Sequence, residues 1–134
     1  YNAVTDSVSA SVEVPAPDLL LKGLGAYNAE DYKSAVEQFN ELLKQDPQHQ
    51  EANFYAGVSY LGMNDAQKAI PCLERARTGT NSSLSEDAEW YLSLAYLKSK
   101  NKSKAEPLLK SIDSRSAGRY RERAADALED LRKP

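Results

Sequence analysis

The sequence predicts an all-α fold of paired helices, and three observations lead to that prediction. A pattern of small and apolar residues occurs three times, and each copy holds an alanine at the same place, namely Ala35, Ala69 and Ala105. These alanines are separated by 34 and 36 residues, a period typical of stacked helix pairs. A short polar turn divides each copy, at residues 29–31, 63–65 and 100–101. Each unit is therefore expected to consist of two short helices joined by a tight turn.

Small side chains recur where the paired helices have to come close together. Gly23, Gly57 and Ser93 each precede a repeat alanine by 12 residues. A large side chain at either place would push the helices apart and lose packing. Tyr60 and Tyr96 lie three residues after the second and third of these small residues, and we expect them to fill the space between units.

Turn-forming residues set the ends of seven expected helices. Asp46-Pro47 closes the first unit, and the two-residue insertion before the third unit falls in the polar stretch 78–83. The expected helices span residues 17–29, 32–45, 48–62, 65–77, 84–99, 102–112 and 117–132. The last of them has a polar outer face, which is typical of a cap that ends a stack of repeats. We expect residues 1–16 to be an extended N-terminal segment and residues 17–134 to be a single domain.

The repeated residues resemble those of the tetratricopeptide repeat. They are Gly23, Ala35, Phe39 and Pro47 in the first unit, Gly57, Tyr60, Ala69 and Ala76 in the second, and Tyr96 and Ala105 in the third. The resemblance implies a right-handed α-α superhelix of about seven antiparallel helices. It places three repeats at about residues 16–49, 50–83 and 86–119, with a capping helix at 117–132. It also implies a scaffold that binds a protein or peptide.

In this family the first helix of each unit lines the concave face of the superhelix. The inward positions fall on Leu20, Leu24, Tyr27, Phe54, Val58, Leu61, Trp90, Leu94 and Leu97, with Asn28, Tyr55, Tyr91 and Lys98 beside them. All nine inward residues are apolar or aromatic, so the resemblance implies binding of an apolar segment. The family members that clamp a C-terminal carboxylate carry Lys, Asn and Arg on this face. Those positions here are Leu20, Leu24, Tyr55, Asp87 and Tyr91, which disfavours that subtype.

Two alternatives stay open for these apolar residues. They can pack between helices, because short apolar helix faces cannot be apportioned from sequence alone. If they form a continuous exposed stripe, something should cover it. The candidates are a peptide partner, a second copy of the domain, which would make the chain a homo-oligomer, and the chain's own residues 1–16.

No arrangement of residues points to catalysis, a cofactor or a metal. The single histidine, His49, lies in a turn and is expected to be solvated, and the single cysteine, Cys72, is expected to be buried within a helix. The chain has 20 acidic and 17 basic residues, a balance that disfavours nucleic-acid binding. We therefore expect a binding protein without enzymatic activity, cofactor or metal.

Compartment and membrane association are weakly constrained. The longest purely apolar run is Leu19–Leu21, far too short to span a bilayer, so we expect no membrane insertion in this segment. The final helix and the lead-in are loosely similar to bacterial repeat domains displayed outside the cytoplasmic membrane on an N-terminal anchor. The chain begins at Tyr1 and not at Met, so such an anchor or signal would lie outside this sequence.

Overall fold

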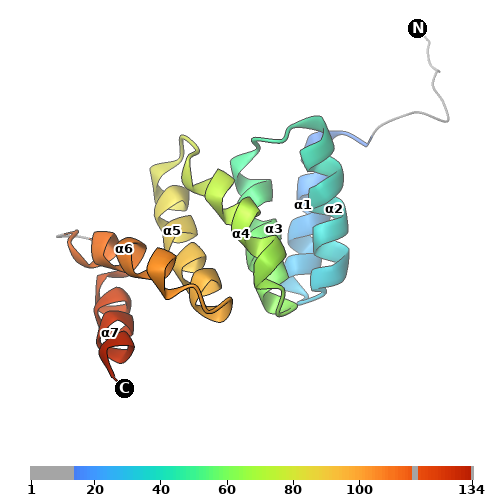
Figure 1. Ribbon diagram of the computed structural model, residues 1–134. Coiled ribbons are helices and arrows are strands. Elements are labelled where there is room, and N and C mark those ends of the chain that lie inside the picture. The colour runs from blue at the N-terminus through green and yellow to red at the C-terminus, as the bar shows by residue number, and fades with distance from the viewer. Residues whose placement is uncertain (1–13, 116–117, 134) are drawn as a thin grey trace, which may run out of the picture.

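The computed structural model describes residues 14–115 and 118–133, and these residues form seven α-helices (Figure 1). The helices are α1 (Ala16–Asn28), α2 (Tyr32–Gln45), α3 (Gln50–Gly62), α4 (Ala66–Arg77), α5 (Ser82–Lys98), α6 (Lys102–Asp113) and α7 (Arg121–Arg132). The predicted helices are confirmed, and their ends agree within two residues everywhere except at the start of α7. Most of the expected extended segment, residues 1–13, lies outside the described residues.

The predicted start of the last helix, residue 117, is wrong by several residues. Residue 117 itself is not among the described residues, but residues 118–120 form a turn and α7 begins at Arg121. The reason is tertiary: the Arg119 backbone N–H donates to Glu86 Oε1 at 3.3 Å, and the Tyr120 hydroxyl donates to Asp87 Oδ1 at 2.6 Å. These bonds to α5 hold the turn in a non-helical conformation.

The turns inside the three units have the same conformation. Glu30, Asn64 and Lys100 have φ angles of 61°, 61° and 62°. These values lie in the left-handed region, which glycine usually occupies at the end of a helix. The next residue of each turn then caps the following helix. The side chains of Asp31, Asp65 and Asn101 accept hydrogen bonds from the backbone N–H groups of Ser34, Lys68 and Lys104. The period in the sequence is therefore a period in backbone geometry.

The recurring small residues lie where the two helices of a unit cross, as predicted. A Cβ atom on Gly23 would collide with the Phe39 ring, and one on Gly57 would lie only 2.6 Å from Leu73 Cγ. In the third unit Ser93 is fully buried, and its hydroxyl donates to the Trp90 carbonyl at 2.6 Å. The repeat alanines are fully buried as well, namely Ala35, Ala69 and Ala105. Close backbone approach thus fixes each helix pair.

The helices form two layers of unequal width. α1 contacts α3 and α3 contacts α5, whereas in the described part of the chain no comparable contact joins α2 with α4 or α4 with α6. The first helices of the units therefore form the tighter, inner layer, and the second helices splay apart on the outside (Figure 1). α7 packs against α6 and ends the stack. Within the described ranges, none of the helices combines the length and apolarity that a bilayer crossing needs.

Candidate functional site

The inner layer repeats the same helix face three times, because equivalent residues are separated by 34 and 36 positions. Three sets of equivalent side chains result: Leu20, Phe54 and Trp90; Leu24, Val58 and Leu94; Leu21, Tyr55 and Tyr91. These sets, with Tyr27, Leu61, Leu97, Asn28 and Lys98, are called the inner face below. Their exposure differs, although their positions along the helices are the same.

Two members of the inner face are buried by the protein itself. Phe54 is 6% exposed and Trp90 is 8% exposed. The ring of Phe54 packs edge-on against Tyr91 with a centroid separation of 5.7 Å, and Trp90 stacks on Tyr120 at 5.6 Å with an interplanar angle of 11°. Little of either ring is accessible, so their main role is to support the residues around them.

The other apolar members of the inner face are half-buried, which leaves part of each side chain open to solvent. They are Leu20, Leu24, Tyr27, Tyr55, Val58, Leu61, Tyr91, Leu94 and Leu97. The polar members, Asn28 and Lys98, are exposed at the ends of α1 and α5. The structure thus brings every predicted site residue onto one layer of helices, but only some of them onto its accessible surface.

A row of aromatic rings joins the three helices of the inner layer. Tyr27 of α1 meets Tyr55 of α3 at 5.1 Å, Tyr55 meets Phe54 at 5.0 Å, and Phe54 meets Tyr91 of α5, all in edge-to-face geometry. Burial raises the pKa of Tyr27 and of Tyr55 above the ordinary value for tyrosine, so these phenols stay neutral and can donate hydrogen bonds. Rigid rings with a polar tip are common anchors in protein interfaces.

The sequence interpretation missed Leu21, which is 69% exposed and is the most exposed large apolar side chain among the described residues. The repeat itself carries the signal that would find it. Leu21 precedes Tyr55 by 34 residues, as Tyr55 precedes Tyr91 by 36. It therefore extends the row of Tyr55 and Tyr91 to the N-terminal end of the stack.

The other end of the inner face is closed by the turn before α7. Tyr120 covers Trp90 and bonds Asp87, while Arg119 Nη1 lies 2.9 Å from Asp87 Oδ1 and Arg119 Nε lies 3.4 Å from Glu86 Oε1. Burial and then the bond to Asp87 raise the pKa of Tyr120, which keeps the phenol protonated. The accessible part of the inner face therefore runs from Leu21 to Tyr91.

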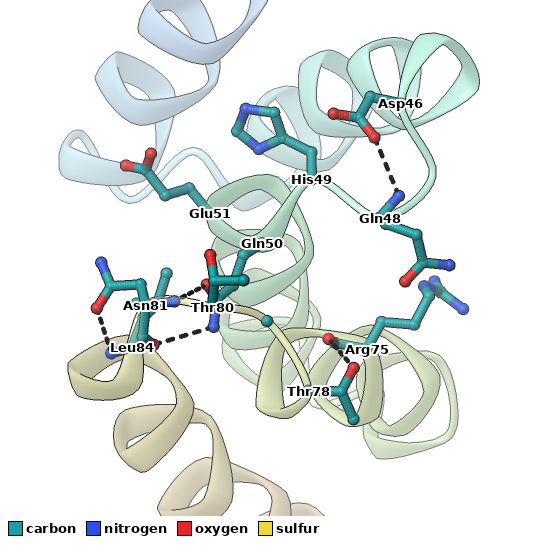
Figure 2. A pocket seen from close by; sticks show the side chains of 11 residues that line it. Asp46, Gln48, His49, Gln50, Glu51, Arg75, Thr78, Thr80, Asn81 and Leu84 are labelled. Atoms are coloured by element: carbon teal, nitrogen blue, oxygen red, sulfur yellow. Dashed lines mark hydrogen bonds between the residues drawn. The ribbon is translucent and has the colours of Figure 1, made fainter.

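A polar cavity of about 550 Å³ lies between the α2–α3 loop and the α4–α5 loop (Figure 2). The Gln50 amide spans it, since its Nε2 donates to the Ala76 carbonyl at 2.7 Å and its Oε1 accepts from the Asn81 N–H at 2.9 Å. His49 is half-buried, and its Nδ1 accepts from the Ala52 N–H at 3.2 Å. His49 lies at the end of the turn, as predicted, and in addition its half-buried ring caps α3. These hydrogen bonds link the α2–α3 loop region to the α4–α5 loop across the cavity.

The structure gives little support for a reactive cysteine or a metal site. Cys72 is buried, as predicted, and burial raises the pKa of its thiol. In the part of the chain that the structure describes, no group of three or more His, Cys, Asp or Glu side chains could hold a metal ion. The inner face is therefore the candidate site.

Comparison with known proteins agrees with this geometry. Residues 20–83, which cover all but the start of the first unit and the whole of the second, match the model of a tetratricopeptide repeat family. No curated protein sequence matches the chain. The helices α5 and α6 continue the same capped and closely packed arrangement beyond the matched residues.

Proposed function

Because this chain is a tetratricopeptide repeat protein, and such repeats are generally non-catalytic protein–protein interaction modules, we propose that its inner face binds an apolar or aromatic segment of a partner. One observation carries the proposal: half-buried rings and aliphatic side chains continue across α1, α3 and α5 from Leu21 to Tyr91. Apolar surface that is shared by three neighbouring helices is unusual unless something covers it.

The charges around the inner face restrict the partner further. Lys98 is exposed at the end of α5 and Glu51 is exposed at the start of α3, so a positive and a negative side chain lie at opposite ends of these helices. Asp87, equivalent to Glu51, is already paired with Arg119. A segment with an apolar centre and a polar group at each end would complement this surface. The row of tyrosines supplies rigid contact area with hydroxyl groups for the segment's main chain.

Substitution of accessible residues tests this proposal, because Phe54 and Trp90 are too buried to be changed without loss of stability. Peptides selected from a displayed random library against the parent chain should be rich in apolar and aromatic residues. Their affinity should fall at least about tenfold in the double variant Tyr55→Ser and Val58→Arg. The matched control is Glu37→Arg, on the exposed outer side of α2, and circular dichroism melts check that each variant is folded. Equal affinity for the parent and the double variant would contradict the proposal.

Self-association is a second candidate function, and the exposed surface of α1 around Leu21 and Gly25 favours it. Leu21 is largely exposed. A Cβ atom added to Gly25, one helical turn later, would meet no atom from other parts of the described chain within 4 Å. A helix of a second copy could approach closely there. Sedimentation velocity of the chain should then show a dimer that Leu21→Asp converts to a monomer. A parent chain that is monomeric at high concentration rules this function out.

A further inference from the structure

A cluster of lysines surrounds the turn between α5 and α6. Lys98, Lys100, Lys102 and Lys104 are all exposed, and none forms an ion pair with a carboxylate in the part of the chain that the structure describes. The equivalent positions are Asn28, Glu30, Tyr32 and Ser34 in the first unit, and Gly62, Asn64, Ala66 and Lys68 in the second. Of the three equivalent turns, only the third therefore carries a cluster of positive side chains, in a chain whose net charge is −3.

The position of these lysines opposes the stability of α6. Lys102 and Lys104 lie in its first turn, where the helix dipole favours acidic side chains. The cap of α6 is also the neutral Asn101, whereas the equivalent caps of α2 and α4 are the carboxylates Asp31 and Asp65. A charge arrangement that works against local stability is expected at functional surfaces. An anionic partner would offset it.

A groove opens beside the lysines on the outer side of the stack. It has a volume of about 440 Å³, lies between α4 and α6, and is lined by Glu74, Arg77, Tyr96, Lys104, Pro107 and Leu108 among others. Tyr96 and Leu108 are buried at its base, and Pro107 is exposed.

Lys104 is the one cation lining the groove that has no carboxylate partner among the described residues. Arg77 Nε lies 3.3 Å from Glu89 Oε2. The Tyr96 hydroxyl donates to Glu74 Oε2 at 2.7 Å, which leaves the Glu74 carboxylate charged. The Lys104 ammonium lies 5.7 Å from the centre of the Tyr96 ring. The groove thus joins an apolar base to a rim that is positive at Lys104 on α6 and negative at Glu74 on α4.

We propose that this groove, together with Lys100, Lys102 and Lys104, binds an acidic segment of a protein partner. One apolar side chain of the segment lies against Pro107, and its carboxylates pair with the lysines. The cavity favours a peptide over a membrane or a nucleic acid, because a side chain fills a groove that a bilayer surface would leave empty. Nucleic-acid binding usually needs exposed aromatic rings on which bases can stack. The aromatic ring that Lys104 contacts is that of Tyr96, which is buried and therefore offers no such platform. This surface is separate from the inner face.

Fluorescence anisotropy with four probes tests the proposal on the full chain. The probes are a labelled peptide with one leucine among glutamates and aspartates, the same peptide with glycine in place of leucine, vesicles of anionic phospholipid, and a single-stranded oligonucleotide. We expect the leucine peptide to bind best, the glycine peptide about fivefold more weakly, and the affinity to fall with added salt. Tighter binding of the vesicles or the oligonucleotide than of the leucine peptide would overturn the proposal.

Matched variants locate the bound peptide. Lys102→Gln combined with Lys104→Gln should weaken binding of the leucine peptide at least about tenfold. Lys68→Gln, at the position equivalent to Lys104, should leave it unchanged. Val58→Arg should also leave it unchanged, so that failure of the inner-face proposal and failure of this one are distinguishable. An equal loss in Lys68→Gln, or no loss in the double variant, refutes the assignment.

Discussion

At the N-terminal end of the stack α1 begins after Pro15 without a side-chain cap, leaves Leu21 largely exposed and has open space beside Gly25. At the C-terminal end, α5 is joined to the elements around it by specific polar bonds and ring stacking. Glu89 pairs with Arg77 of α4 at 3.3 Å and with Arg115 at 2.5 Å, and Tyr120 stacks on Trp90.

The difference shows that equivalent helices of a repeat protein can have opposite roles. The end of the stack at α7 is closed by contacts within the chain, so its apolar residues contribute to stability. The end at α1 leaves the apolar side chain of Leu21 exposed. Apolar residues at the two ends should therefore contribute unequally to stability, and the following changes test that difference.

The largest difference in the free energy of unfolding is expected when one apolar residue at each end of the stack is replaced by alanine. Trp90→Ala should lower the free energy of unfolding by about 3–4 kcal/mol, because it leaves a cavity and removes the stacking partner of Tyr120. Leu21→Ala should change it by less than about 0.5 kcal/mol, since that side chain is exposed. Urea denaturation measures both. Similar losses in the two variants would mean that the ends do not differ in role.

A smaller loss is expected when the buried carboxylate at the C-terminal end is removed. Glu89→Ala leaves Arg77 and Arg115 without their partner, but their side chains are 44% and 32% exposed and can turn to solvent. We therefore expect a loss of about 2 kcal/mol, below that of a fully buried pair. Relative to the parent chain, amide hydrogen exchange in Glu89→Ala should accelerate more in α5 and α6 than in α1 and α2. Uniformly faster exchange along the chain would argue against a local role.

Alkaline pH should weaken the contact that Tyr96 of α5 makes with Glu74 of α4. Burial, followed by the bond to Glu74, raises the pKa of Tyr96 to about 12, above the ordinary value of about 10. The folded state therefore favours the neutral phenol, so its contribution is complete below pH 10 and is lost as the pH rises toward 12. We expect a loss of about 1–2 kcal/mol in urea titrations across this range. Tyr96→Phe should reduce this loss, and an equal loss in the parent chain and in Tyr96→Phe would contradict the assignment to this phenol.

The smallest effects are expected in the left-handed turns. Glu30→Gly and Lys100→Gly should each stabilise the chain by up to about 1 kcal/mol, because glycine adopts a positive φ without steric cost. Asn64→Gly should change less, since asparagine tolerates this conformation. Thermal melts resolve the order of the three variants. A destabilised Lys100→Gly would show that its side chain contributes to folding, and would separate the third turn from the other two.

Most of the fold could be predicted from the sequence, because its causes are local or strictly periodic. Small residues at a constant spacing, such as Gly57 before Ala69, impose close helix pairs, and turn residues end the helices within two positions of the prediction. The seventh helix was the exception. Its start depends on bonds from Arg119 and Tyr120 to α5, more than 30 residues earlier, which no local pattern encodes.

The candidate site was predictable as a set of positions but not as a surface. The repeat alone determined that Leu20, Phe54 and Trp90 share one place on the inner layer. Only the tertiary structure decided that Phe54 and Trp90 are buried while Leu21 is exposed. The physical reason is that periodicity specifies the direction in which a side chain points from its helix. Its exposure depends on what packs over it, which for Trp90 is Tyr120 and for Leu21 is nothing within the described residues.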